Sequence, residues 1–68
     1  MKPDYAEAHN NLGVTLHDLG QLDAAVKSYE QALAIKPDYA NACNNLGVTL
    51  QELGQLDAAV KSYEQALA

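Results

Sequence analysis

The chain has 68 residues, of which 49% are hydrophobic, and nine acidic side chains against four lysines give a net charge of −5 at neutral pH. A chain of this length buries only about 60% of the surface that it exposes when unfolded, which predicts one small unit of modest stability. The acidic balance argues against nucleic acids and anionic membranes as partners, because binding to phosphate groups requires clustered Lys or Arg.

The first predicted helix covers residues 5–19, whose apolar side chains recur at the i+3 and i+4 spacing of one helical face. The residues expected on that face are Ala8, Leu12, Leu16 and Leu19. Asp4 followed by Glu7 has the form of a capping box, and Gly20 suits a left-handed residue just past the end of the helix. Gly13 lies inside the helix, where glycine costs about 1 kcal/mol relative to alanine. We interpret it as a site of close helix packing, in preference to a hinge.

The second predicted helix covers residues 22–36 and carries another apolar stripe. Its members are Leu22, Ala25, Val26, Tyr29, Ala32 and Leu33. Asp23 in the first turn and Lys36 in the last turn have the charges that the helix dipole favours, and Pro37 prevents the helix from continuing. The first half of the chain therefore predicts two helices joined by a turn at Gly20.

The second half of the chain repeats the first, because residues 1–34 and 35–68 are identical at 29 of 34 aligned positions. The pairs that differ are Met1/Ile35, Glu7/Asn41, His9/Cys43, His17/Gln51 and Asp18/Glu52. A fixed period of this length is typical of a solenoid, in which one supersecondary unit stacks on copies of itself. We therefore expect function to lie in a surface built by stacking.

The third and fourth predicted helices cover residues 39–53 and 56–68. Their apolar stripes contain Ala42, Leu46, Leu50 and Leu53, then Leu56, Ala59, Val60, Tyr63, Ala66 and Leu67. Asp38 stands at the expected N-cap of the third helix, but Asn41 replaces the glutamate, so this capping box is weaker. Four helices without strands predict an all-α fold.

The pattern resembles the tetratricopeptide repeat, whose 34-residue signature is Trp-x2-Leu-Gly-x2-Tyr, then Ala-x3-Phe, then Pro. The matching residues are His9, Leu12, Gly13, Leu16, Ala25, Tyr29, Ala32 and Pro37, then Cys43, Leu46, Gly47, Leu50, Ala59, Tyr63 and Ala66. His9 and Cys43 depart from the preferred Trp, and Leu16 and Leu50 from the preferred Tyr. The chain is similar to repeats of O-linked N-acetylglucosamine transferases and of bacterial arrays.

The resemblance implies two stacked antiparallel helix-turn-helix repeats, one over residues 3–36 and a truncated one over 37–68 without a capping helix. They would form a single unit from a right-handed α-solenoid, and the abrupt ends suggest a piece of a longer, natural or engineered, array. Such repeats act as protein-interaction scaffolds and not as enzymes, and their concave groove holds an extended peptide or a partner helix. The implied groove residues are Glu7, Asn10, Asn11, Val14, His17, Asp18, Asn41, Asn44, Asn45, Val48, Gln51 and Glu52.

Two features of this groove bear on its ligand. Asn11 and Asn45 resemble the asparagine ladder of the transferase repeats, in which side-chain amides pair with the donors and acceptors of a peptide backbone. None of the groove residues is a lysine or an arginine, and their carboxylates would repel the acidic C-terminus that a carboxylate clamp binds. Three of the five differing pairs lie in the groove, which fits a tuned binding surface and fits neutral drift about equally.

Neither catalytic residues nor a cofactor or metal site is expected. His9, His17 and Cys43 are the soft metal ligands of the sequence, whereas a structural zinc site needs four ligands in tetrahedral geometry. One cysteine cannot form an internal disulfide. The sequence contains no signal-peptide pattern and no apolar run of transmembrane length, so a cytoplasmic location is expected.

An alternative function from another class is structural self-assembly. The last helix would leave apolar residues bare, and an exposed apolar stripe favours association. The residues of this self-association surface are Leu56, Val60, Tyr63 and Leu67. Head-to-tail stacking would continue the superhelix, and exchange of helices between two chains is another route. The isolated chain is therefore expected to form homo-oligomers.

Overall fold

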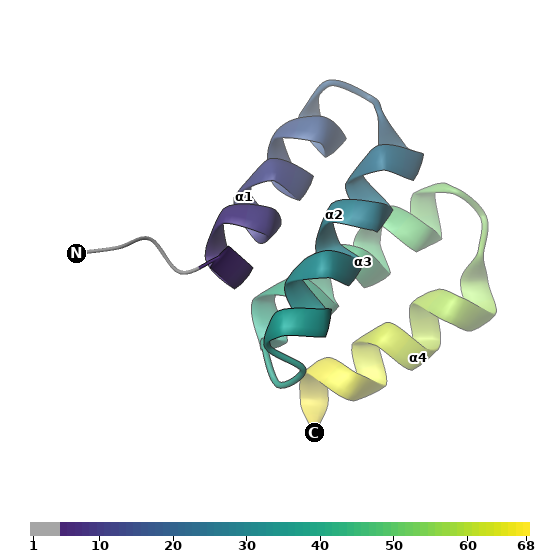
Figure 1. Ribbon diagram of the computed structural model, residues 1–68. Helices are drawn as coiled ribbons and strands as arrows, with labels where there is room; N and C mark the ends of the chain where they lie inside the picture. The colour runs from purple at the N-terminus through teal and green to yellow at the C-terminus, as the bar shows by residue number, and fades with distance from the viewer. Residues whose placement is uncertain (1–4) are drawn as a thin grey trace.

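The computed structural model describes residues 5–68, which form four α-helices joined by short turns (Figure 1). The helices are α1 (Tyr5–Asp18), α2 (Leu22–Ile35), α3 (Ala40–Glu52) and α4 (Leu56–Leu67). The predicted all-α class is confirmed, since the described residues contain no strand, and each helix end lies within one residue of its predicted position.

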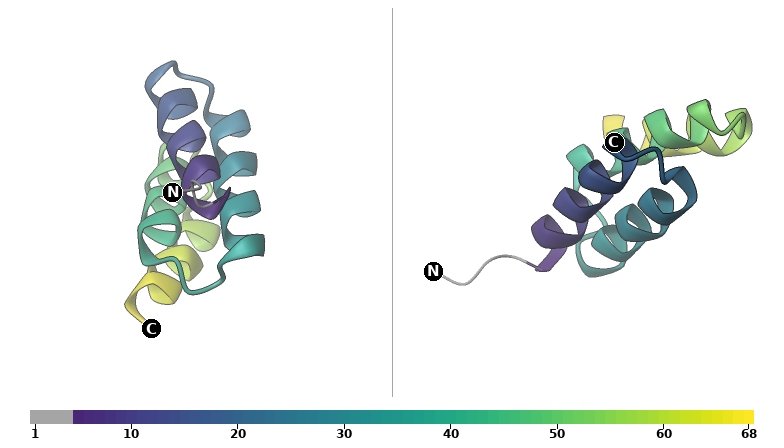
Figure 2. Two further views of the ribbon diagram at one scale, coloured as in Figure 1. Left: turned by 60° about the vertical axis from the view of Figure 1, so that its left-hand side comes forward. Right: turned by 90° about the horizontal axis from the view of Figure 1, so that it is seen from above.

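The helices form two antiparallel hairpins that stack on each other (Figures 1 and 2). α1 pairs with α2 and α3 pairs with α4, while α2 packs against α3 and thereby joins the two repeats. α1 also touches α3, so the first helices of the two repeats are neighbours. This arrangement places the predicted groove residues of both repeats on adjacent helices.

Each hairpin closes through the same hydrogen-bonded turn. Gly20 and Gly54 both have a φ of 80°, which confirms the predicted left-handed residue after the helix. The Gln21 N–H donates to the Leu16 carbonyl at 2.9 Å and the Gly20 N–H donates to the His17 carbonyl at 2.9 Å, the pairing of a Schellman motif. The second repeat reproduces both bonds, with Gln55 donating to Leu50 and Gly54 to Gln51.

The start of α3 differs from the prediction. The N-cap is Tyr39, with φ −79° and ψ 90°, and no side chain caps the helix, so the capping box expected at Asp38 is wrong. The Tyr39 N–H donates to the Lys36 carbonyl at 3.1 Å, and the resulting turn across Pro37 holds Asp38 one residue before the cap. The capping box predicted at Asp4 lies outside the described residues.

The core lies on both sides of α3, which packs against α2 on one side and against α4 on the other. Its buried members are Ala25, Tyr29, Leu46, Leu50 and Ala59. A Cβ atom added at Gly13 would come closer to the Tyr29 ring than real contacts allow, and one added at Gly47 would lie 2.7 Å from the Tyr63 ring. The interpretation of Gly13 as a close-packing site is therefore confirmed, with a tyrosine ring as the group that occupies the space.

The apolar stripe predicted for the first helix is largely exposed. Ala8 is exposed, Leu12 is 49% exposed and Leu19 is 66% exposed, whereas α1 buries Ala6, Asn10 and Gly13 instead. The equivalent stripe of α3 is buried at Ala42, Leu46 and Leu50. The two copies differ because α3 is packed between α2 and α4, while the same face of α1 has no helix against it among the described residues.

Candidate functional site

The twelve predicted groove residues lie on α1 and α3, six on each helix. The structure brings four of them, Val14, His17, Asn45 and Val48, around one hollow of about 110 Å³. Asn10 is buried, whereas Glu7, Asn11, Asn41 and Asn44 are exposed at other points of the two helices. The hollow is therefore where the two repeats contribute side chains to one site.

Two lining residues were not predicted as site residues. Tyr29 is 2% exposed and Thr49 is fully buried, so these side chains form the inner wall of the hollow. Val14 and Val48, at 39% and 37% exposed, stand at its rim. The apolar pattern places Tyr29 in the core stripe of the second helix. No signal in the sequence indicates that one edge of its ring also borders a hollow at the surface.

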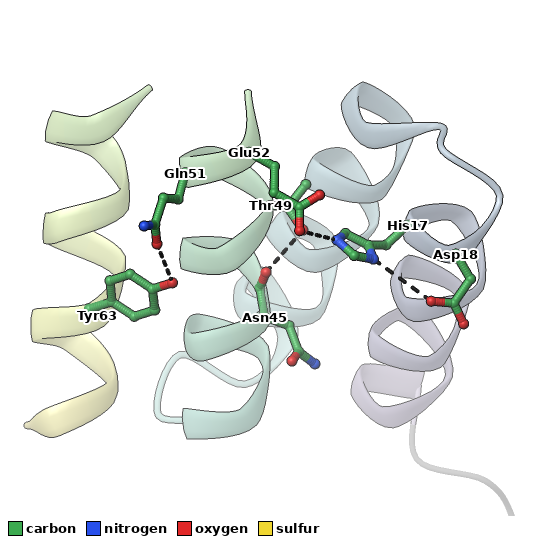
Figure 3. Close-up of polar contacts among 7 residues, drawn as sticks. All are labelled: His17, Asp18, Asn45, Thr49, Gln51, Glu52 and Tyr63. Carbon is green, nitrogen blue, oxygen red and sulfur yellow. Dashed lines mark hydrogen bonds and ion pairs between the residues drawn. The ribbon is translucent and has the colours of Figure 1, made fainter. Parts of the chain in front are cut away.

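The asparagines predicted as a ladder are not equivalent in the structure. Asn45 donates through Nδ2 to Oδ1 of Asn10 at 3.1 Å, while Asn11 is exposed. The Asn45 backbone carbonyl accepts a hydrogen bond from Thr49 Oγ1 at 3.0 Å (Figure 3). An asparagine amide has two N–H donors and one carbonyl acceptor, so Asn45 keeps one N–H and its oxygen for another partner.

A second polar bridge crosses the repeats at His17. Its Nε2 lies 2.9 Å from Oε1 of Glu52 on α3, and its Nδ1 lies 3.8 Å from Oδ1 of Asp18 (Figure 3). The hydrogen bond with Glu52 raises the pKa of His17, an effect that partial burial opposes and that the two carboxylate charges reinforce. The imidazole therefore favours its protonated form more than a free histidine does.

Both cross-repeat bonds join residues 35 apart in the sequence, Asn10 with Asn45 and His17 with Glu52. This separation is one more than the 34-residue period, so α3 is offset from α1 by about one residue along the stack. At the equivalent place in the second repeat, Gln51 accepts a hydrogen bond from the Tyr63 hydroxyl at 3.1 Å. Three of the positions that distinguish the two copies, 17, 51 and 52, are thus used in hydrogen bonds.

The groove side is acidic. Glu7, Asp18 and Glu52 are exposed carboxylates, and the twelve residues contain no lysine. The side chain of Asp18 is 75% exposed and that of Glu52 is 46% exposed. Both remain accessible to a cationic ligand, although each also contacts His17.

The outer face of α4 exposes several large apolar side chains. Leu56 is 59% exposed, Val60 is 54% exposed and Leu67 is 87% exposed. The fourth residue predicted for this surface, Tyr63, is partly buried and packs toward Gly47 and Gln51 of its own repeat. The equivalent residues of α2, Leu22, Val26 and Leu33, are all less exposed.

The geometry of residues 5–68 does not support a metal site, a reactive cysteine or a membrane-spanning helix. No group of three or more His, Cys, Asp or Glu side chains could hold a metal ion in this part of the chain. Cys43 is 1% exposed, and burial raises the pKa of its thiol, which disfavours the reactive thiolate. None of the described helices has the length and apolar character that crossing a bilayer requires.

Comparison with known proteins gives consistent matches along the chain. A family model described as TPR repeat matches residues 15–54, and two described as tetratricopeptide repeat match residues 1–27 and 42–68. The fold is similar to the crystal structure of MamA, with 35% sequence identity and a TM-score of 0.89 over 93% of this chain. The chain spans 37% of the length of that protein. A search of the curated proteins finds no match.

Proposed function

The chain belongs to the tetratricopeptide repeat family, and from that premise we propose that the groove between α1 and α3 binds an extended peptide segment of a partner protein. The family and the fold support a protein-interaction scaffold in general. The observation that carries the more specific proposal is the hollow of about 110 Å³ that both repeats line, with the Asn45 amide at its edge.

A peptide suits this site because the groups present match a backbone in extended conformation. Asn45 is held in place by Asn10 and still has one donor and one acceptor. Asn11, one repeat earlier, is exposed and equally able to pair with backbone groups. Amides on successive first helices can therefore bind a strand without regard to its side chains.

The experiment selects binders from a displayed library of random octapeptides and measures their affinity by fluorescence anisotropy. The double substitution Asn11→Ala with Asn45→Ala is expected to weaken binding roughly tenfold, since each lost hydrogen bond contributes about 0.5–1.5 kcal/mol. Gln31→Ala removes an exposed amide from α2, which carries none of the predicted groove residues, and serves as the matched control. Circular dichroism checks that helicity is unchanged. Equal affinities for the double variant and the control would exclude the ladder.

Self-association is a second candidate function, favoured by the near-identity of the repeats. The α4 sequence 56–67 is identical to α2 sequence 22–33, and α1 carries the stripe that α3 buries. Placing α4 of one copy against α1 of another would reproduce the contact that α2 makes with α3. Such a contact is heterologous and continues from copy to copy, so it generates chains of molecules.

The test uses two variants that each block one end. Val60→Lys places a charge on the α4 face, and Leu12→Lys places one on the α1 stripe, both at half-exposed positions that tolerate a polar side chain. In sedimentation each variant alone is expected to be monomeric, while the wild type grows in mass with concentration. Mixing the two variants restores one intact contact and should give a 1:1 dimer that grows no further. A wild type that stays monomeric up to millimolar concentration excludes this function.

A further inference from the structure

We propose that the hollow between α1 and α3 selects a peptide in which a small branched aliphatic residue is followed or preceded by Lys or Arg. This inference rests on the proposed peptide-binding function and names the class of peptide. The aliphatic side chain enters the hollow, the backbone pairs with Asn45, and the cationic neighbour lies against Glu52 and Asp18.

The size of the hollow sets the first requirement. Its volume of about 110 Å³ is smaller than the roughly 150 Å³ of an engineered cavity that accommodates benzene. A side chain of three or four carbons fits within this volume, whereas an aromatic ring would extend beyond it. The methyl groups of Val14 and Val48 and the ring of Tyr29 provide apolar contacts for it.

The polar groups at the edge set the orientation of the peptide. Asn45 lines the hollow, so a residue that inserts its side chain brings its own backbone to the free N–H and oxygen of this amide. Asn10 holds the amide through Oδ1, which restricts its rotation before a ligand arrives. A preorganised partner of this kind loses less entropy on binding.

The charges set the second requirement. His17 lines the hollow and contacts both carboxylates, so Glu52 and Asp18 lie one side chain away from the hollow, within reach of a residue next to the inserted one. The imidazole of His17 is shared between the two carboxylates, and the groove residues contain no lysine in a chain of net charge −5, so negative charge remains on this side of the hollow. A Lys or Arg next to the aliphatic residue is attracted, whereas Asp or Glu there is repelled, and added salt weakens both effects.

The experiment compares four octapeptides on the wild-type chain by fluorescence anisotropy, at low and at high salt. The peptides share a Ser/Thr background and differ only in the two central residues. These residues are Val-Lys, Ala-Lys, Phe-Lys and Val-Glu in the four peptides. Val-Lys is expected to bind roughly tenfold more tightly than Ala-Lys, because valine places two more carbon atoms in the hollow than alanine does. Phe-Lys is expected to bind at least about threefold more weakly than Val-Lys because its ring overfills the space. Val-Glu should lose about three- to tenfold at low salt and less at high salt.

Two variants assign these preferences to their residues. Val48→Phe fills the hollow and should abolish the advantage of Val-Lys over Ala-Lys. Glu52→Gln should reduce the advantage of Val-Lys over Val-Glu, and Glu52→Gln with Asp18→Asn should abolish it. Glu30→Gln removes one carboxylate from α2, away from the predicted groove residues, and serves as the charge control. Equal binding of all four peptides would overturn the selectivity and leave peptide binding intact. Absence of binding by all four peptides and by library-selected ones would overturn both.

Discussion

Identical residues in the two copies have different roles because their neighbours differ. Asn45 bridges to Asn10, whereas its copy Asn11 is exposed. Asn10 is 7% exposed, whereas its copy Asn44 lies at the surface. The residue type is therefore not sufficient to assign a role in a repeat, and each role follows from whether another repeat lies on that side.

The bridge between His17 and Glu52 predicts a dependence of stability on pH. The pKa of His17 is raised in the folded state above its ordinary value of 6.5, so the protonated imidazole stabilises the fold. This contribution is fully present below pH 6.5 and is lost as the pH rises through the higher pKa of the folded state. Because both side chains are partly exposed, the effect should stay below about 1 kcal/mol. Urea denaturation between pH 5 and 9 measures it.

The repeat supplies its own control substitution for this bridge. His17→Gln introduces the residue that the second copy carries at position 51 and removes the titrating group while keeping a hydrogen-bonding side chain. The difference in unfolding free energy between wild type and His17→Gln should be larger at pH 5 than at pH 9. The same comparison in a chain that carries His9→Gln, and so lacks the other histidine, should show the same effect of His17→Gln at each pH. A pH profile that is the same for wild type and His17→Gln would contradict the role of the bridge.

Gly13 and Gly47 allow a comparison of the same substitution at two equivalent sites. An added Cβ would overlap the Tyr29 ring at Gly13 and the Tyr63 ring at Gly47. Overpacking costs about 1–3 kcal/mol, which exceeds the gain of about 1 kcal/mol in helix propensity. Tyr29 is 2% exposed and is therefore more confined by its neighbours than Tyr63, which is only partly buried. We expect Gly13→Ala to lower the free energy of unfolding by roughly 1 kcal/mol, and Gly47→Ala to lower it less; equal losses would contradict this reason.

At the scale of the element, the helix ends depend on the backbone more than on packing. Gly20 and Gly54 have positive φ values, and a Cβ added at either would meet no atom within 4 Å. Gly20→Ala and Gly54→Ala are therefore expected to cost about 1 kcal/mol each through conformational strain alone. Gly20→Asn should cost less, because asparagine tolerates the left-handed region. Thermal denaturation measures these losses, and an alanine variant as stable as the wild type would contradict the Schellman assignment.

These same elements show what the sequence could predict. Helix bounds and turn glycines follow from local rules, and all four helices were placed within one residue, although the N-cap of α3 is Tyr39 and not Asp38. The buried face of α1 was predicted wrongly, because Leu12 and Leu46 have the same sequence surroundings and only the neighbouring helix distinguishes them. The contact of His17 with Glu52 depends on the one-residue offset between stacked helices, which periodicity alone does not reveal. The hollow was missed for the same reason.

At the scale of the whole molecule, both ends present the surfaces that its middle buries. α1 exposes the stripe that α3 packs against α2, and α4 exposes the residues that α2 packs against α3. In repeat proteins stability is approximately a sum of terms within each repeat and terms between neighbours. The two described repeats contain one such interface between repeats, so the addition of a single further helix should have a large effect on stability.

Extension of the chain after Ala68 by a copy of residues 35–53 tests this expectation. The added helix should partly cover Leu56, Val60 and Leu67, as α3 partly covers the equivalent residues of α2, so each contributes less than the about 1.5–3 kcal/mol of full burial, before ordering costs. Each net kcal/mol should raise Tm by roughly 4–8 °C for a chain of this size. A control extension has Lys at the positions that copy Ala42, Leu46 and Leu50, so it adds equal length without the apolar stripe. We expect Tm to rise for the first extension and not for the control, whereas equal values for both would show that the exposed face of α4 does not accept a further helix.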